Sequence, residues 1–318
     1  QVSPLPDKPL SKAELNKLQD KYGFSIDTTK DWYPSLRVAC EVFGKAKKEN
    51  KDILFFVHGY NNDMGDVLKT AKTLEKLYNL VVVPFSWPAN GGGKLSGTAA
   101  YRSDKDDARG SATALNRALQ KIHYYHQLLT ESTRLRVKAL SSQKFPDNSE
   151  KARMWYVKEL DKLCKVRVSL LCHSMGNYVF KHASLPSSTS AHQLIFDNIA
   201  LVAADVNNPG HDGWVEKLST RNRLYVVINE NDGALKWSRR KPGEEQLARL
   251  GHHLKNLTAP NAYYLDVTRS KGVGKDHSYF KGKPVTDNNK LKLMFTRVFT
   301  GETAETSLQY FPDLNLYR

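Results

Sequence analysis

Six short apolar runs are spaced along the chain, and each is almost continuous in hydrophobic residues rather than alternating with polar ones. A strand has such a continuous run when both of its faces are covered, as in a parallel sheet with helices on either side. We therefore predict six mainly parallel strands, at residues 53–57, 80–85, 166–171, 199–203, 224–228 and 262–267.

Stretches with the apolar spacing of amphipathic helices lie between these runs. The first stripe consists of Val67, Leu68, Ala71, Leu74 and Leu77, and a longer one consists of Ala108, Ala112, Leu115, Leu119, Ile122 and Leu129. Strands that alternate with crossover helices predict an α/β fold, with a doubly wound, mostly parallel sheet and helices on both faces.

Two segments fall outside this alternation. Residues 1–50 predict a helical extension, with a capping box from Ser11 to Glu14, a C-cap glycine at Gly23 and a second helix over residues 35–48. Residues 130–164 are charged, contain more chain than a crossover needs and have a helical stripe of their own. We therefore predict an extension over 1–50 and an α/β domain over 51–318, with an inserted arm or lid at about 130–164.

The strongest chemical signal follows the third apolar run, where Cys172 and His173 lead into Ser174, Met175 and Gly176. A serine on a sharp turn between a buried strand and a helix is the arrangement of a nucleophile elbow. Gly176 meets the need for a small residue after the serine, and Cys172 stands where a glycine is usual. The turn would expose the Ser174 hydroxyl and direct the Met175 N–H toward the reacting atom. An ordinary strand–loop–helix connection is the alternative.

The first apolar run ends in a second chemical signal, the loop from His58 to Asn62. Gly59 would let this loop bend toward the elbow, so that the Tyr60 N–H joins the Met175 N–H in an oxyanion hole; a simple turn glycine is the alternative. We expect four residues to contribute to substrate binding, although aromatic side chains at such positions also occur in cores: His58, Gly59, Trp87 and Tyr178.

A serine nucleophile needs a histidine base, and the base needs a carboxylate. In chain order after Ser174, Asp232 follows the fifth run and His277 follows the sixth, and both fall on loops at the carboxyl ends of strands. We predict this triad. Asp205 and Glu230 remain alternative acids, and two further histidines remain alternative bases, at positions 252 and 253.

These segments together resemble the α/β-hydrolase superfamily, and more narrowly a bacterial α/β-hydrolase group of unknown function. The shared motifs are His58–Asn62, Phe-Ser-Trp-Pro at 85–88, His-Ser-Met-Gly-Asn at 173–177, Asn-Asp-Gly-Ala-Leu at 231–235, Arg-Leu-Gly at 249–251 and His-Ser-Tyr-Phe at 277–280. The resemblance covers roughly residues 51–280 and implies an α/β-hydrolase fold for the 51–318 domain. It also implies Ser174, Asp232 and His277 as the triad, with Tyr60 and Met175 as oxyanion donors.

Composition and charge limit the partners. The 318 residues carry 48 Lys and Arg against 33 Asp and Glu, a net charge of +15. The lysines are scattered and do not interleave with aromatic residues, so we expect a merely solvated surface and no nucleic acid; an anionic membrane surface as a partner is the alternative. The oligomeric state is left open.

Other patterns bear on cofactors and on compartment. No dinucleotide fingerprint follows the first run and no metal-ligand spacing stands out, so we expect neither cofactor nor metal. Three cysteines cannot all pair, which favours a reducing compartment, and we expect the cytoplasm. No apolar run approaches the roughly 20 residues of a membrane-spanning helix. Removal of a leader and secretion remain an alternative.

We therefore predict a serine hydrolase, esterase- or lipase-like, that cleaves carboxylic esters through an acyl-enzyme. The expected substrate is a small-molecule or lipid ester, with a phospholipid as one candidate. An amidase or thioesterase with the same triad is the first alternative, because fold and triad do not fix the acyl donor. A non-catalytic basic docking module on a hydrolase scaffold is the second.

Overall fold

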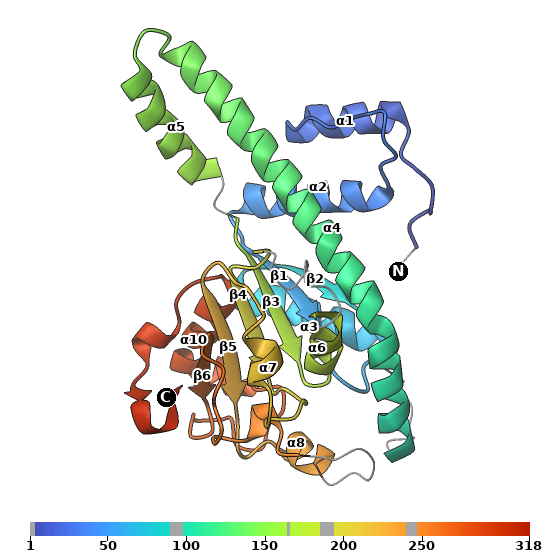
Figure 1. Ribbon diagram of the computed structural model, residues 1–318, viewed down its shortest axis with the longest axis vertical. Coiled ribbons are helices and arrows are strands. Elements are labelled where there is room, and N and C mark those ends of the chain that lie inside the picture. The colour runs from blue at the N-terminus through green and yellow to red at the C-terminus, as the bar shows by residue number, and fades with distance from the viewer. Residues whose placement is uncertain (1–3, 90–97, 164–165, 185–193, 240–246) are drawn as a thin grey trace. The chain divides into compact units, whose positions relative to one another are not determined.

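The computed structural model describes residues 4–89, 98–163, 166–184, 194–239 and 247–318 (Figure 1). The chain divides into two compact units, which we describe separately. One contains residues 1–51 and 120–166, and the other contains residues 52–119 and 167–318. The long helix α4 (Thr98–Lys144) contributes residues to both units. The expected N-terminal extension and the expected arm at about 130–164 both fall in the first unit, except that residue 164 lies outside the described residues.

The larger unit is built on an eight-stranded sheet in the order β2-β1-β3-β4-β5-β6-β8-β7. All neighbouring strands are parallel except β7 and β8, which are antiparallel. The strands are β1 (Ile53–Val57), β2 (Val81–Phe85), β3 (Val168–His173), β4 (Asn198–Val202), β5 (Arg223–Ile228), β6 (Ala262–Asp266), β7 (Tyr310–Phe311) and β8 (Leu316–Tyr317).

The α/β fold with a mostly parallel, doubly wound sheet is confirmed, and each of the six apolar runs overlaps a strand whose ends lie within two residues of the predicted ones. The sequence analysis did not predict β7 and β8. Each contains only two residues, which is too short for a recognisable apolar run.

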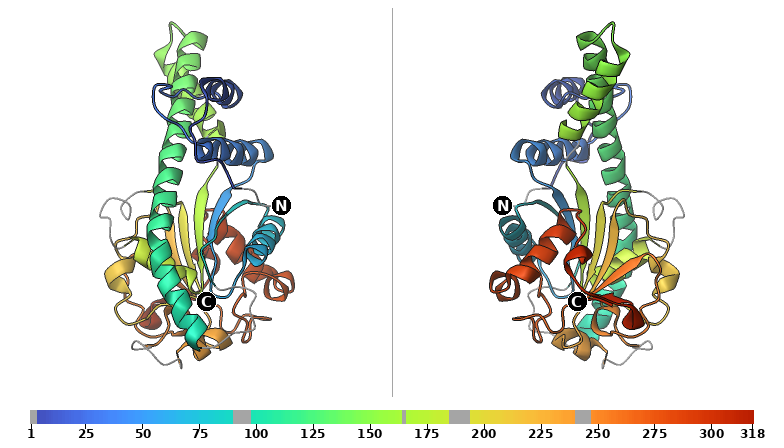
Figure 2. Two further views of the ribbon diagram at one scale, coloured as in Figure 1. Left: turned by 90° about the vertical axis from the view of Figure 1, so that its right-hand side faces the viewer. Right: turned by 90° about the vertical axis from the view of Figure 1, so that its left-hand side faces the viewer.

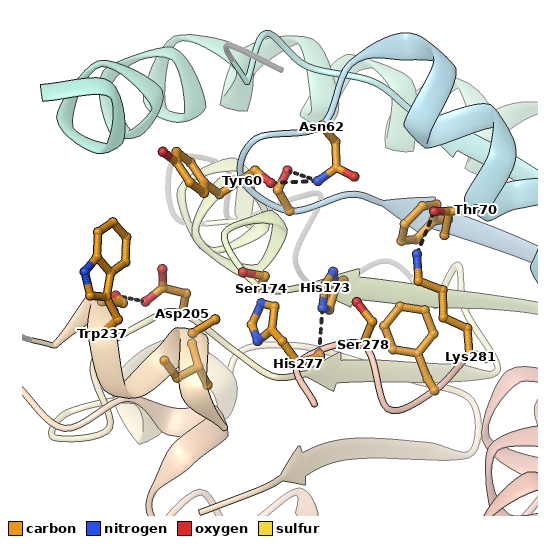
Figure 3. A pocket seen from close by; sticks show the side chains of 16 residues that line it. Tyr60, Asn62, Thr70, His173, Ser174, Asp205, Trp237, His277, Ser278 and Lys281 are labelled. Atoms are coloured by element: carbon orange, nitrogen blue, oxygen red, sulfur yellow. Dashed lines mark hydrogen bonds between the residues drawn. The ribbon is translucent and has the colours of Figure 1, made fainter. Parts of the chain in front are cut away.

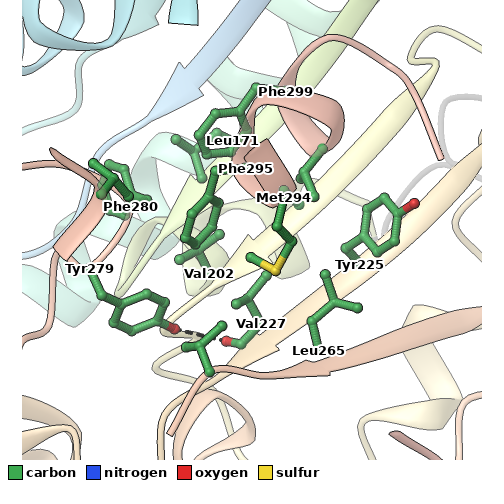
Figure 4. Packing of buried hydrophobic residues seen from close by; sticks show 14 of the residues in the cluster. Leu171, Val202, Tyr225, Val227, Leu265, Tyr279, Phe280, Met294, Phe295 and Phe299 are labelled. Carbon is green, nitrogen blue, oxygen red and sulfur yellow. Dashed lines mark hydrogen bonds between the residues drawn. The ribbon is translucent and has the colours of Figure 1, made fainter. Parts of the chain in front are cut away.

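Helices cover both faces of this sheet (Figure 2). On one face lie α3 (Met64–Tyr78) and α10 (Asn289–Phe299), and on the other lie α6 (Gly176–Ser184) and α7 (Asp212–Val215). Side chains of α10 pack on alternate residues of the central strands and form the main core (Figure 4). This cluster includes Leu171, Val202, Tyr225, Val227, Leu265, Tyr279, Phe280, Met294, Phe295 and Phe299.

Local sequence signals fix the helices that border the strand ends. Helix α3 begins at a capping box in which the side chains of Asp63 and Asp66 each accept a backbone N–H, and it ends at Asn79 in the left-handed conformation. Helix α8 (Gly233–Ser238) begins at Asp232, whose side chain accepts the N–H groups of Ala234 and Leu235. A third short helix, α9 (Lys283–Thr286), precedes α10.

The smaller unit is helical in its described part. It contains α1 (Lys12–Tyr22), α2 (Pro34–Glu49), the later residues of α4, and α5 (Ser149–Leu163). The capping box of Ser11 with Glu14 is present, and Gly23 ends α1 with φ +66°. The core of this unit consists of Leu10, Leu15, Leu18, Phe24, Trp32, Leu36, Cys40 and Tyr125. In neither unit do the described residues include a helix that is long and apolar enough to cross a membrane.

Candidate active site

Ser174 lies on a strained turn between β3 and α6. Its φ is +54°, in the left-handed region that non-glycine residues rarely adopt, and only 6% of its surface is exposed. The Ser174 N–H donates to the carbonyl of Val202, and its own carbonyl accepts the N–H groups of Asp205 and Asn177. A strained residue that its surroundings hold so firmly is typical of functional sites. The strand–turn–helix expected around Ser174 is therefore present.

Two neighbouring residues enforce this turn. A Cβ at Gly176 would lie 2.6 Å from the carbonyl oxygens of both Val57 and His58, so only glycine lets α6 begin this close to the end of β1. The buried amide of Asn177 donates to the carbonyls of Cys172 and Ser174 at 3.0 Å.

Cys172 is fully buried, and burial raises the pKa of its thiol well above the ordinary value, which fits a structural cysteine rather than a nucleophile.

The loop that follows β1 packs directly against the turn. A Cβ at Gly59 would lie 2.7 Å from the Cβ of Ser174, so the backbone of this loop can approach the serine only because residue 59 has no side chain. The Asn62 side chain donates to the Tyr60 carbonyl at 2.7 Å and fixes the bend. The described residues offer the Met175 N–H no hydrogen-bond acceptor.

His58 and Trp87, which were predicted to contribute to substrate binding, pack against each other in the core. The rings stack with centroids 5.2 Å apart, and both residues are buried. The Trp87 N–H donates to Nε2 of His58 at 3.1 Å, and the indole N–H donates to the His58 carbonyl at 2.9 Å. Burial lowers the pKa of His58, in keeping with a neutral ring. Both side chains therefore serve to join the ends of β1 and β2.

Tyr178 also lies in packing contacts. It is 8% exposed, and its hydroxyl accepts a hydrogen bond from Nε of Arg109 at 2.7 Å. Of the four residues expected to bind substrate, Gly59 lines the pocket beside Ser174, whereas His58, Trp87 and Tyr178 are absent from its described lining.

The structure brings His277 and Asp232 together although 45 residues separate them. Nδ1 of His277 lies 2.7 Å from Oδ2 of Asp232, which is fully buried. The other carboxylate oxygen of Asp232 accepts the two N–H groups at the start of α8. Since the carboxylate can only accept, Nδ1 of His277 is the donor in this contact.

His173 connects the turn to the loop of His277, a contact that the sequence analysis did not predict. Its Nε2–H donates to the carbonyl of His277 at 3.1 Å, and the two rings lie 4.7 Å apart. Burial, and then the proximity of His277, lowers the pKa of His173 well below its ordinary value. A neutral His173 can therefore hold the backbone of His277 without adding charge beside it.

The rival acids have other partners or are exposed, although Asp205 also lines the pocket beside Ser174. Oδ1 of Asp205 lies 3.0 Å from Nε of Arg249, with only 4% and 2% of the two side chains exposed. The same oxygen accepts the hydroxyl of Ser238 at 2.6 Å. Glu230 is exposed, and Asp276 caps its own loop by accepting the Ser278 N–H. The alternative bases His252 and His253 are absent from the described pocket lining.

A pocket of about 310 Å³ opens beside Ser174 (Figure 3). The Ser174 hydroxyl and the imidazole of His277 lie next to one another in its middle, with Tyr60 and Trp237 toward one end and Thr70 and Lys281 toward the other. The sequence analysis did not identify Thr70 or Lys281. The position of Lys281, directly after the His-Ser-Tyr-Phe motif, is the only signal that could have drawn attention to it.

No group of three or more His, Cys, Asp or Glu in the described ranges could hold a metal ion. Residues 39–130, less than a third of the chain, match the model of a family described as "Alpha/beta hydrolase of unknown function (DUF900)". Comparisons with curated proteins and with solved structures give no match. The matched segment contains the loop at residues 58–62 but ends before Ser174. The resemblance inferred from the sequence is confirmed at this level: residues 39–130 are similar to an α/β-hydrolase family of unknown function, and the sheet has the mostly parallel α/β architecture that this resemblance implies.

Proposed function

We propose that the protein is a serine hydrolase that cleaves carboxylic esters through an acyl-enzyme, with Ser174, His277 and Asp232 as its triad. The observation that carries the proposal is the convergence of three loops at the carboxyl ends of β3, β5 and β6. One presents a strained serine, one a buried carboxylate and one a histidine bonded to that carboxylate.

The first half of the reaction follows from the positions of the protons. Nε2 of His277 takes the proton of the Ser174 hydroxyl as Oγ bonds to the ester carbonyl carbon, and Asp232 stabilises the imidazolium that results. The Met175 and Tyr60 N–H groups stabilise the oxyanion. The tetrahedral intermediate then breaks its bond to the leaving oxygen, which takes the proton from Nε2 and departs as an alcohol.

The second half releases the acid. Water gives a proton to Nε2 of His277 as its oxygen attacks the acyl carbon, and the second tetrahedral intermediate expels Ser174. The serine recovers its proton from His277, so the enzyme returns to its starting state. The net change is the addition of one water molecule across the ester bond.

The size and lining of the pocket indicate which esters the site would accept. Its volume of about 310 Å³ is at the lower end of the range for ligand sites, which favours a short acyl group over a long fatty chain. Phe56 and Trp237 provide apolar contact beside the polar groups. We therefore place a small ester ahead of a long-chain lipid or phospholipid, with amides and thioesters as the alternatives.

A hydrolysis panel tests the proposal. p-Nitrophenyl butyrate, its amide analogue and its thioester analogue are offered to the wild type and to Ser174→Ala. We expect the wild type to hydrolyse the ester faster than the amide or the thioester, and we expect Ser174→Ala to lose a factor of up to about 10⁶ in kcat. Ser184→Ala, at the far end of α6 and outside the described pocket lining, serves as the matched control and keeps full activity. A Ser174→Ala enzyme as active as the wild type overturns the proposal, and a wild type that hydrolyses none of the three substrates favours the docking module.

A further inference from the structure

We propose that Lys281 binds an anionic group of the substrate, so that the preferred ester bears a carboxylate or a phosphate in addition to the bond that is cleaved. This inference rests on the proposed ester hydrolysis and names the substrate class for the same site. It starts from a side-chain amine that lies in the pocket of Ser174 without a carboxylate partner.

Lys281 and Thr70 form one wall of the pocket (Figure 3). Nζ of Lys281 donates to the hydroxyl of Thr70 at 2.9 Å. Thr70 belongs to α3 and is only 6% exposed, so its hydroxyl is a fixed acceptor. An ammonium group has three N–H donors, and Thr70 uses one of them. Two donors remain for a ligand in the pocket.

The charges around Lys281 leave its own charge unpaired. No carboxylate of the described residues forms an ion pair with it. Asp276 and Asp66 act on it only at longer range, since Asp276 caps the loop at Ser278 and Asp66 caps α3. Lys69 opposes them, and burial lowers the pKa of Lys281. A partly buried ammonium with no counter-ion is less favourable than one in water, and an anionic ligand would supply the missing charge.

The backbone holds Lys281 in a set position relative to His277. The Lys281 N–H donates to the carbonyl of Ser278 at 2.9 Å, which closes a tight turn. The hydroxyl of Tyr78, also in α3, donates to the carbonyl of Phe280 at 2.5 Å. The base and the amine therefore lie on one loop that α3 anchors twice, through Thr70 and Tyr78. A ligand held by Lys281 would be positioned with little loss of entropy.

The test compares matched esters that differ by one anionic group. One pair is p-nitrophenyl butyrate and the mono-p-nitrophenyl ester of glutaric acid, which adds a carboxylate. The other pair is monobutyrin and butyryl glycerol phosphate, which adds a phosphate. We expect the wild type to favour the charged member of at least one pair in kcat/KM, and that pair identifies the source of the anion.

Lys281→Gln keeps most of the side chain and removes the charge. A charge-assisted hydrogen bond corresponds to a factor of about 10 to 100, so we expect this variant to lower the charged-to-neutral ratio of kcat/KM by that factor, mainly through KM. Lys281→Arg is expected to recover part of the ratio. Lys69→Gln, at an exposed lysine of α3 next to Thr70, is the control for overall charge and is expected to keep the ratio within about twofold.

Binding separates this inference from the proposed function. If the wild type hydrolyses none of the four esters, their dissociation constants are measured on Ser174→Ala with and without Lys281→Gln. Lys281-dependent binding of a charged ester would then support the anion site while the esterase proposal fails. No preference for charge in either pair, or an equal effect of Lys281→Gln and Lys69→Gln, overturns the anion site.

Discussion

The carboxylate of Asp232 makes two kinds of contact at once: one oxygen accepts the Nδ1–H of His277 at 2.7 Å, and the other caps helix α8. The cap fixes the carboxylate before any substrate arrives. The bond to His277 fixes the tautomer of the ring. One buried side chain therefore both begins a helix and orients the ring of His277.

Asp232→Asn separates these two contacts. The amide oxygen still accepts the N–H groups of Ala234 and Leu235, and Asn caps helices about as well as Asp, so we expect little loss of stability. The amide N–H, however, would donate to Nδ1 of His277 and leave the proton on Nε2, where it cannot accept from Ser174. Steady-state kinetics with an ester should show a loss of about 10⁴ in kcat. A variant with normal kcat would exclude Asp232 as the triad acid.

For Asp205→Asn we expect the opposite of Asp232→Asn, a loss of stability with little loss of kcat. Removing the negative charge breaks the buried ion pair with Arg249, and breaking a buried pair costs about 3–5 kcal/mol in the free energy of unfolding. Urea denaturation measures this loss, and Arg249→Met in the same chain should recover part of it. A loss of kcat as large as that of Asp232→Asn, with stability unchanged, would instead make Asp205 the triad acid.

The sequence predicted the sheet and the edge at which the site lies, because buried parallel strands have continuous apolar runs and their carboxyl ends meet at one edge. Ser174, Asp232 and His277 each follow such a run. The pairing of Asp205 with Arg249 could not be predicted from the sequence, because it depends on how two loops pack. Those loops meet at an isolated bridge between Asn207 and Arg249.

Gly176→Ala tests the close approach of α6 to β1. The added Cβ would lie 2.6 Å from two carbonyl oxygens, so the helix start or the end of β1 must move. We expect a loss of about 1–3 kcal/mol in stability, the usual range for overpacking, together with a fall in kcat as Ser174 shifts. Urea denaturation and ester kinetics on the same preparation measure both. Wild-type values in both would show that the turn is not constrained as described.

Acid should destabilise the protein through its buried histidines. Burial lowers the pKa of His58 and His173 below the ordinary 6.5, so the unfolded chain binds protons that the folded chain resists. The histidine contribution is therefore complete above pH 6.5 and is lost as the pH falls below it, by up to about 1.4 kcal/mol per pH unit for each ring. Burial raises the carboxyl pKa values of Asp52 and Asp197, which act in the opposite direction at more acidic pH.

Urea denaturation at pH values from about 7.5 down to about 5.5 measures this slope, over a range where histidine dominates. His58→Gln keeps an acceptor and a donor for its neighbours, so we expect a smaller slope in this variant. A free energy of unfolding that is constant over the range would contradict neutral, buried rings at positions 58 and 173.

The positions of His58 and Trp87, which were predicted to contribute to substrate binding, show what the sequence alone does not determine within a site. Both residues stand in motifs beside the expected oxyanion loop, and proximity in sequence suggested contact with substrate. The structure pairs them with each other in the core instead. Lys281 and Thr70 show the converse, because their meeting in the pocket depends on the packing of α3 against a loop more than 200 residues later.

The most direct measurement is covalent labelling of the wild-type protein with a fluorophosphonate, followed by mass spectrometry of its peptides. The phosphonyl group should be found on Ser174 alone, should be absent from Ser174→Ala, and should form far more slowly on Asp232→Asn. A protein that stays unlabelled, or that is labelled on another residue while Ser174→Ala is labelled equally, would contradict Ser174 as the activated nucleophile.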